Sequence, residues 1–159
     1  MLDILLKLVP SILVVGGWVV VYQLQALQAR RKLLREEMDK ARDAVAELQE
    51  AALRFHMSVY SVADRMLVIG LLTDIDRRLT LFPRIATSRH WFLPNSVMPQ
   101  DVTVNLDYLV RLRQAITLEH FDDPEMTPLV LGDPLINNIT GASAQMVFEL
   151  DRVFVAAID

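Results

Sequence analysis

The sequence of 159 residues contains no cysteine and only three histidines. Without cysteine there is no disulfide framework, no thiolate ligand for zinc and no thiol nucleophile. Glycine-rich phosphate-binding loops and the Gly-x-Ser-x-Gly elbow of hydrolases are also missing from the chain. With three histidines and no cysteine, few side chains titrate near neutral pH. These absences favour a protein that is not an enzyme, and we expect no bound cofactor.

Charge is nearly absent from the start of the chain. The twenty residues Leu5–Leu24 include one charged side chain, Lys7. A helix of this length spans about 30 Å, the thickness of the hydrocarbon core of a bilayer. Trp18 and Tyr22 lie near the end of the run, and aromatic residues of this kind gather at the membrane interface. Residues 1–28 are therefore predicted to form one transmembrane anchor, with membrane lipid as a partner.

Positive charge follows the apolar run immediately. Arg30, Arg31, Lys32 and Arg35 place the following residues on the cytoplasmic side, with the N-terminus outside. A cleaved signal peptide is the alternative, but the small residues after the run have the wrong spacing for a cleavage site. Arginine far outnumbers lysine, which is typical of GC-rich bacterial genomes. We expect a single-pass protein of the bacterial inner (plasma) membrane with a cytoplasmic C-terminal domain.

A heptad pattern follows the anchor. Apolar residues recur at alternating steps of four and three over about five heptads, which predicts a helical stalk at residues 29–58. The pattern favours a continuous helix, or one with a mild kink, beyond residue 58, although Ser61 and Asp64 have the spacing of a capping box that begins a new helix. The seam is expected to join copies of the chain, or to be filled equally well by another helix of the same chain. The residues assigned to this oligomer seam are Leu34, Met38, Val45, Leu48 and Phe55.

Residues 59–159 are predicted to form a cytosolic helical domain. A second apolar stripe indicates a helix that is buried on two sides. Proline-rich segments separate it from two further helices, and no alternating strand pattern occurs. The fold class is therefore all-α: an N-terminal transmembrane helix continues into a long cytosolic helix and a compact helical bundle. The second stripe consists of Val68, Leu72, Ile75, Leu79 and Phe82.

The two later helices have recognisable starts. Asp101 or Thr103 is expected to cap a helix that runs to about His120. Asp133 followed by Pro134 reads as an N-cap and a proline in the first helical turn, which begins a last helix ending near residue 158. The inward residues of the earlier helix are predicted to be Leu106, Leu109, Leu112 and Ile116. Those of the last helix are Leu135, Ile139, Ala142, Met146, Leu150, Val153 and Ala157.

The net charge of −4 is unevenly distributed. Residues 54–100 carry six basic and three acidic side chains, whereas residues 101–159 carry three basic and ten acidic ones. An acidic surface repels a polyanion. Nucleic acid is therefore an unexpected partner for the C-terminal third.

Two pairs of residues match the Arg-x4–6-His spacing of HEPN ribonucleases, in which basic residues steady the phosphate and histidine moves protons. They are Arg84 with His90 and Arg113 with His120. With three histidines and 13 arginines in the chain, at least one such match is about as probable as not by chance. A membrane-tethered HEPN-like ribonuclease is therefore only a second alternative, and these residues are weak catalytic candidates.

An acidic cluster follows the same histidine. His120, Asp122, Asp123 and Glu125 could together hold a divalent ion through oxygen and imidazole ligands. No second cluster completes the coordination shell, and acidic turns at helix ends are common. We therefore expect no metal here.

Basic and aromatic residues meet in the proline-rich segment. Arg89, Trp91 and Phe92 have the composition of a site for a protein partner, a lipid head group or a neighbouring subunit. The alternative is that the two aromatic side chains close the core of their own domain from a loop.

These features lead to three hypotheses. The first is a membrane-anchored, non-enzymatic helical protein that self-assembles at the cytoplasmic face, as a scaffold or a pore-forming effector, in a layout that also suits bacterial defence. The second is a small subunit of a larger membrane complex. The third is the tethered ribonuclease.

Overall fold

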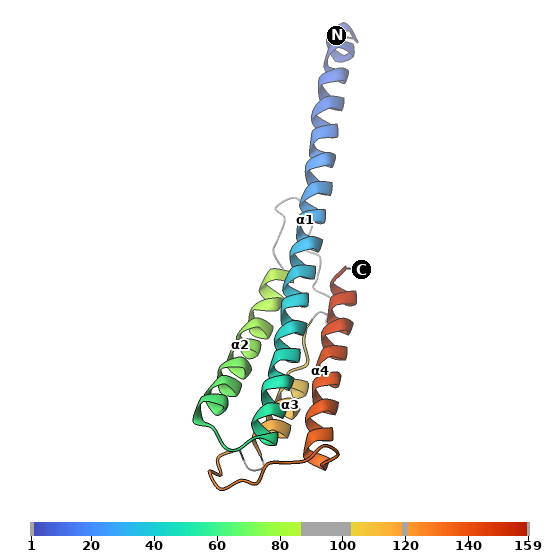
Figure 1. Cartoon of the computed structure of the whole chain (residues 1–159). Coiled ribbons are helices and arrows are strands. Elements are labelled where there is room, and N and C mark those ends of the chain that lie inside the picture. Colours follow the sequence, from blue (N-terminus) through green and yellow to red (C-terminus); the bar gives the residue numbers. More distant parts are fainter. Residues whose placement is uncertain (1, 87–102, 119–120, 159) are drawn as a thin grey trace. The chain divides into compact units, whose positions relative to one another are not determined.

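The structure is a computed structural model that describes residues 2–86, 103–118 and 121–158, without the side chains of residues 2–12, 27, 30, 83–86, 157 and 158. This part of the chain contains four helices and no strand, so the predicted all-α class is confirmed (Figure 1). The helices are α1 (Leu2–Met57), α2 (Val62–Ala86), α3 (Asp107–Thr117) and α4 (Pro134–Ile158).

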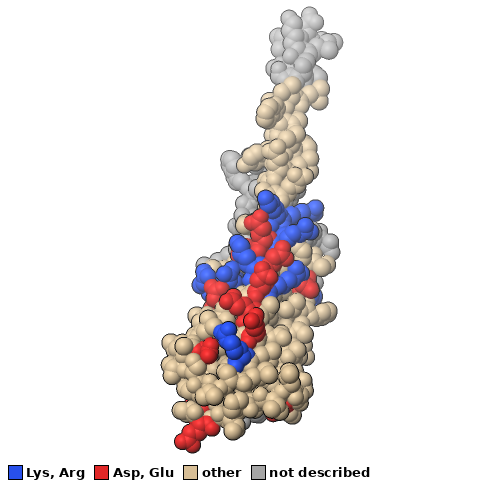
Figure 2. All heavy atoms as spheres, in the orientation of Figure 1, with Lys and Arg blue, Asp and Glu red and all other residues tan. Residues whose placement is uncertain are grey.

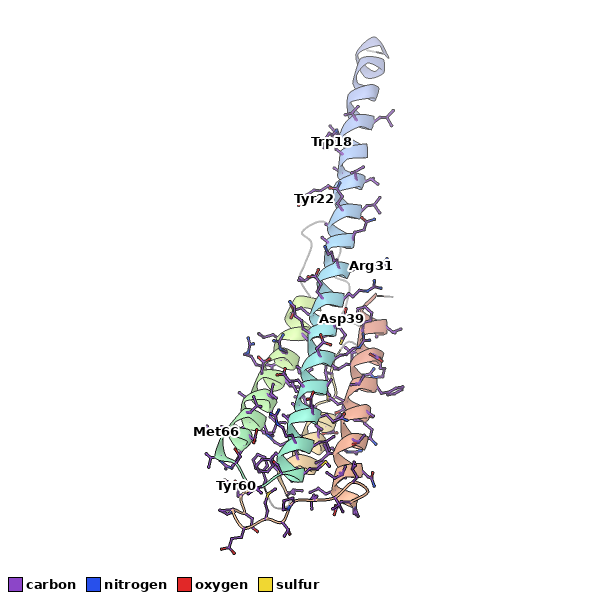
Figure 3. The ribbon with its side chains drawn as sticks, in the orientation of Figure 1. Trp18, Tyr22, Arg31, Asp39, Tyr60 and Met66 are labelled. Atoms are coloured by element: carbon purple, nitrogen blue, oxygen red, sulfur yellow. The ribbon has the colours of Figure 1, made fainter. Side chains whose placement is uncertain are left out.

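The chain divides into two units, Met1–Arg35 and Glu36–Asp159. The first unit is the N-terminal part of α1, and its apolar side chains from Leu13 to Leu24 are exposed. Trp18 and Tyr22 stand out from the helix four residues apart (Figure 3). Among the residues that the structure describes, no helix is long and apolar enough to span a bilayer.

The second unit is a bundle in which the C-terminal part of α1 runs between α2 and α4, with α3 behind (Figure 1). Side-chain contacts join the helices pairwise. Arg42 on α1 donates from Nε to the Asp151 carboxylate of α4 at 2.7 Å. At the other end of the bundle, the Nε2 atom of His56 lies 2.9 Å from the Ile116 carbonyl oxygen of α3.

Four of the five residues assigned to the heptad seam lie in the core of this bundle within a single copy of the chain. Met38, Val45, Leu48 and Phe55 are almost completely buried there, and Leu34 is buried as well. The second stripe, on α2, and the described inward residues of α4 are also buried. Helices of the same chain therefore fill the seam, which is the alternative that the periodicity left open. The seam residues are therefore not exposed for contact with a second copy of the chain.

The expected continuous helix through residues 58–61 is wrong, because α1 ends at Met57 and α2 begins at Val62. The capping alternative is the one observed: the Ser61 hydroxyl oxygen accepts a hydrogen bond from the Asp64 backbone N–H at 3.3 Å. The residues Ser58–Val62 are β-branched, aromatic or serine, all of which are weaker helix formers than alanine or leucine. The apolar periodicity did not reveal this turn, because Val59, Val62 and Met66 continue the heptad spacing across it although their side chains are exposed.

The start of α3 is also later than expected. The helix begins at Asp107, whose backbone N–H is bound by the Asn105 side chain at 2.9 Å, and not after a cap at Asp101 or Thr103. Leu106, predicted to point inward, is therefore outside the helix and 49% exposed.

The start of α4 follows the prediction. The Asp133 carboxylate accepts a hydrogen bond from the Leu135 backbone N–H at 2.8 Å, as expected of an N-cap. Gly132 comes directly before this cap and has φ of 97°, a left-handed conformation that favours glycine.

Candidate functional site

A groove of about 460 Å³ lies between α3 and α4 and is the candidate functional site. The two helices pack against each other. Small residues are part of its lining: Ala115 on α3, with Gly141 and Ala142 on α4. A Cβ atom built on Gly141 would meet no other atom within 4 Å. The lining therefore includes three residues with no side chain larger than a methyl group.

Uncharged polar side chains are also part of the lining. Four carboxamides line the groove, from Gln114 on α3 and from Asn137, Asn138 and Gln145 on α4. A carboxamide both donates and accepts hydrogen bonds. The Asn137 amide nitrogen makes one long contact of 3.5 Å with the Gly132 carbonyl oxygen. The described lining of the groove thus presents many donors and acceptors, and it includes no carboxylate.

One charged side chain, that of Arg111, reaches the groove. Its guanidinium carbon lies 5.9 Å from the ring centroid of Tyr108, one helical turn earlier. Among the residues that the structure describes, no carboxylate forms an ion pair with Arg111. The one charged side chain in the described lining is therefore positive, although the C-terminal third of the chain is acidic.

The beginning of α3 is held against α4 by a buried carboxylate. Glu149 is 3% exposed, accepts the backbone N–H of Asn105 at 2.9 Å, and binds the Arg152 guanidinium at 2.8 Å. Arg152 in turn donates to the Thr103 carbonyl oxygen at 3.3 Å. The Arg152 hydrogen bonds, and to a lesser degree the Asn105 N–H, hold the pKa of Glu149 below its ordinary value, and burial opposes them. This network positions one wall of the groove.

A second surface is apolar. We call Val59, Val62, Met66 and Leu67 the turn–α2 surface; all four side chains are exposed. Met66 and the nearby Tyr60 are labelled at this end of α2 (Figure 3). On the face shown in Figure 2, most charged side chains gather toward the opposite end of the bundle, and fewer lie toward the turn end, where Arg54 pairs with Asp64 and Arg65 with Asp122.

The charged end of the bundle consists of ion pairs. Arg42 binds both Asp39 and Asp151, and Asp74 accepts hydrogen bonds from Arg77 and Arg78 at 2.6 Å each. The bonds from Arg77 and Arg78 hold the pKa of Asp74 below its ordinary value. Such surface pairs neutralise one another and offer no reactive group.

Most of the catalytic and partner-binding candidates named from the sequence lie outside the described residues. His90, Arg89, Trp91, Phe92 and His120 fall there. The backbone of Arg84 belongs to α2, but its side chain is not described. Arg113 is exposed on α3, one turn before Thr117, whose hydroxyl group donates to its carbonyl oxygen. The ribonuclease hypothesis therefore stays a prediction.

The acidic cluster after α3 has structural partners. Asp122 is bound by the Arg65 guanidinium at 2.6 and 2.9 Å, and Asp123 accepts the backbone N–H of Glu125 at 2.9 Å. Within the described ranges, no three His, Asp or Glu side chains are placed to hold a metal ion together. The turn is tied to the core by Phe121, whose ring centroid lies 5.1 Å from that of Phe55.

The sequence reasoning did not find the groove. Its signal is the placement of small residues at inward positions of two antiparallel helices, and this becomes informative only when the pairing of the helices is known. Comparison of the chain with protein families, curated proteins and solved structures finds no match.

Proposed function

We propose that the chain is a membrane-anchored, non-enzymatic helical protein that works by binding other protein chains at the cytoplasmic face of the membrane. One observation carries the proposal: the apolar side chains from Leu13 to Leu24 are exposed on a helix that has no charge in this stretch. An exposed apolar surface of this length is stable only when lipid or another protein covers it. The apolar run itself begins earlier, at Leu5.

The orientation proposed for the anchor follows from the charges after it. Arg31, Lys32 and Arg35 come directly after the apolar run, and basic residues at the end of a span stay on the cytoplasmic side. The unit Glu36–Asp159 is then the cytoplasmic part. A bacterial inner membrane is the location we propose.

Binding is favoured over catalysis by the chemistry of this unit. Most of its described ion pairs join arginines to aspartates, and the groove between α3 and α4 is lined by carboxamides, Arg111 and small or apolar residues. Carboxamides bind well but are poor acids, bases and nucleophiles. The turn–α2 surface adds exposed apolar side chains of the kind that protein interfaces bury.

Copies of the chain are the first partner we propose. Anchoring in one membrane raises the local concentration of the copies, so that a modest apolar contact becomes effective. The turn–α2 surface is the proposed contact, since the heptad seam is filled within one copy. Such an assembly acts as a scaffold or, if the anchors line a ring, as a pore.

A subunit of a larger membrane complex is the second candidate function. The burial of the seam in a single copy favours it, because the most extensive apolar stripe of the chain is not free for self-association. The groove between α3 and α4 is then a contact with a different protein.

Membrane anchoring is tested by alkaline carbonate extraction of cells that express the full chain. The chain is expected to stay with the membrane pellet, whereas the double variant Val15→Arg/Val20→Arg is expected to be released. The matched control is Val130→Arg/Leu131→Arg, which places the same charges on exposed apolar residues of the other unit. Release of the unmodified chain, or equal release of both variants, would contradict the anchor.

Self-assembly is tested by native mass spectrometry of the full chain in detergent. A discrete oligomer that dissociates in Met66→Asp would support the turn–α2 contact, with Thr73→Asp on the same helix as control. A monomer that co-purifies with other proteins would instead select the subunit function.

A further inference from the structure

We propose that the groove between α3 and α4 binds an extended segment of another protein and places an acidic side chain of that segment at Arg111. The proposal rests on the proposed function in one respect only, that the partner is a protein. It adds the conformation and the charge of what is bound.

The dimensions of the groove fit a short segment. Its lining runs from Arg111 to Leu118 along α3 and from Leu135 to Gln145 along α4. At a helical rise of 1.5 Å per residue, these stretches are about 10 and 15 Å long. An extended chain advances about 3.3 Å per residue, so the groove accommodates roughly three to five residues. Its volume of about 460 Å³ lies in the range of sites that enclose a ligand of this size.

The carboxamides favour an extended backbone over a helix. Every residue of an extended segment has a backbone N–H and C=O that need partners. Gln114, Asn138 and Gln145 each provide a donor and an acceptor, from both walls of the groove. A bound helix satisfies its own backbone groups and selects an apolar groove instead. The polar lining would then be buried without partners, which is unfavourable.

Gly141 allows the segment to approach closely. Nothing lies within 4 Å of the position that its Cβ would occupy, so the backbone of α4 is open to the groove at this point. Ala115 and Ala142 also line the groove, and their small side chains take up little of its space. Leu118 and Leu135 supply apolar area for one side chain of the bound segment.

The charge of the groove selects an acidic residue. Arg111 brings a guanidinium to a lining whose described residues include no carboxylate, and arginine binds a carboxylate through two parallel hydrogen bonds. A nucleic acid would also meet Arg111, but it would bring many phosphates to the acidic C-terminal third, where residues 101–159 carry ten acidic and three basic side chains. A single carboxylate on a peptide avoids that repulsion.

The test selects peptides from a random seven-residue library displayed on phage, against the full chain in detergent micelles. The enriched peptides are expected to share one Asp or Glu. For a synthetic peptide of the enriched sequence, replacing that residue by Asn or Gln should weaken binding at least tenfold. In Arg111→Gln this preference should disappear, because the neutral side chain no longer distinguishes the acid from the amide.

The groove itself is tested by Gly141→Leu, which fills it. Binding of the enriched peptide is expected to fall at least tenfold. The matched control is Gly70→Leu on α2, since Gly70 is also within a helix and also has nothing within 4 Å of its Cβ position. Neither variant should lower the melting temperature of the parent, because leucine is a better helix former than glycine. If Gly141→Leu does not fold, Gln114→Ala/Asn138→Ala removes the hydrogen-bonding groups and leaves the small residues of the lining.

Several outcomes would overturn the proposal. They are the absence of any enriched peptide, enrichment without an acidic residue, equal loss of binding in the two glycine variants, and unchanged binding in Gln114→Ala/Asn138→Ala. Binding of a ten-nucleotide RNA probe that is lost in Gly141→Leu, without peptide binding, would assign the groove to nucleic acid. The peptide selection uses protein in micelles and does not depend on whether the chain resists carbonate extraction. The membrane anchor and the peptide-binding groove can therefore be contradicted independently of each other.

Discussion

Glu149 on α4 accepts the backbone N–H of Asn105, 44 positions earlier in the chain, at 2.9 Å. Its carboxylate is nearly inaccessible to solvent and is also bound by Arg152. One buried charge therefore holds the residues that begin α3 against α4, and it positions the helix that carries Arg111. The groove depends on this contact although Glu149 does not line it.

Replacing Glu149 by Gln is expected to lower the free energy of unfolding by about 1.5–3 kcal/mol, the usual range for hydrogen bonds to a buried charged group. Glutamine retains the size of the side chain but loses the charge that Arg152 and the Asn105 N–H stabilise. Urea denaturation followed by circular dichroism measures the difference. Asp107→Asn, an exposed acidic residue at the start of α3, serves as control and is expected to change little. Equal effects in the two variants would show that the buried network is unimportant.

The contribution of Glu149 is expected to depend on pH. Its folded pKa lies below its ordinary value, chiefly because Arg152 binds the ionised carboxylate. Its contribution is therefore complete above the unfolded glutamate pKa of about 4.3 and is lost as the pH falls through the folded pKa. The stability difference between the parent and Glu149→Gln should be constant near neutral pH and shrink below about pH 4.3. A difference that persists unchanged to pH 2 would contradict this linkage.

Gly70 and Gly141 lie within helices, and we expect both to lower the free energy of unfolding relative to alanine. Gly70→Ala and Gly141→Ala should each raise the free energy of unfolding by up to about 1 kcal/mol, because alanine restricts the unfolded chain and no atom obstructs its methyl group. Gly132→Ala should have the opposite effect and lower stability by about 1–2 kcal/mol, since Gly132 has a positive φ. Thermal unfolding of the three variants checks the signs. A stabilised Gly132→Ala would contradict the left-handed turn before α4.

The seam is expected to stabilise one copy of the chain, whatever the oligomeric state. Leu48→Ala should lower the free energy of unfolding by about 2–5 kcal/mol, as is usual for a buried leucine. Because the contacts lie within one chain, the loss should be the same at low and high protein concentration. Val130→Ala, at an exposed apolar residue, is the control. A loss that depends on concentration would instead place the seam between copies.

Much of the bundle could be predicted because its signals are local. The stripes on α2 and α4 repeat at the spacing of a helical turn, and the Asp133 cap lies next to the helix that it begins. The break at Ser58–Ser61 was misjudged for a physical reason. Weak helix formers shift the local balance by less than about 1 kcal/mol each, so the packing of the following helix decides whether a turn forms. Leu106 was misplaced because the helix begins at Asp107.

The groove could not be predicted in the same way. Ala115 and Gly141 resemble ordinary helix residues in the sequence, and only the packing of α3 against α4 brings both into the lining of one groove. Glu149 likewise resembles any acidic residue of a surface helix until the Asn105 backbone and Arg152 are seen around it. Sites of this kind depend on contacts between distant parts of the chain.

By itself the sequence determined the helical class, the spacing of the buried stripes and the apolar run before Arg31, because these follow from periodicity and composition along the chain. Only the tertiary structure decided that α1 ends at Met57 and that helices of the same chain fill the seam. It also decided where the groove between α3 and α4 opens. The physical reason is that a periodic pattern specifies which side chains must be buried. Which surface covers them, and what space remains, is settled only by the packing of one helix against another.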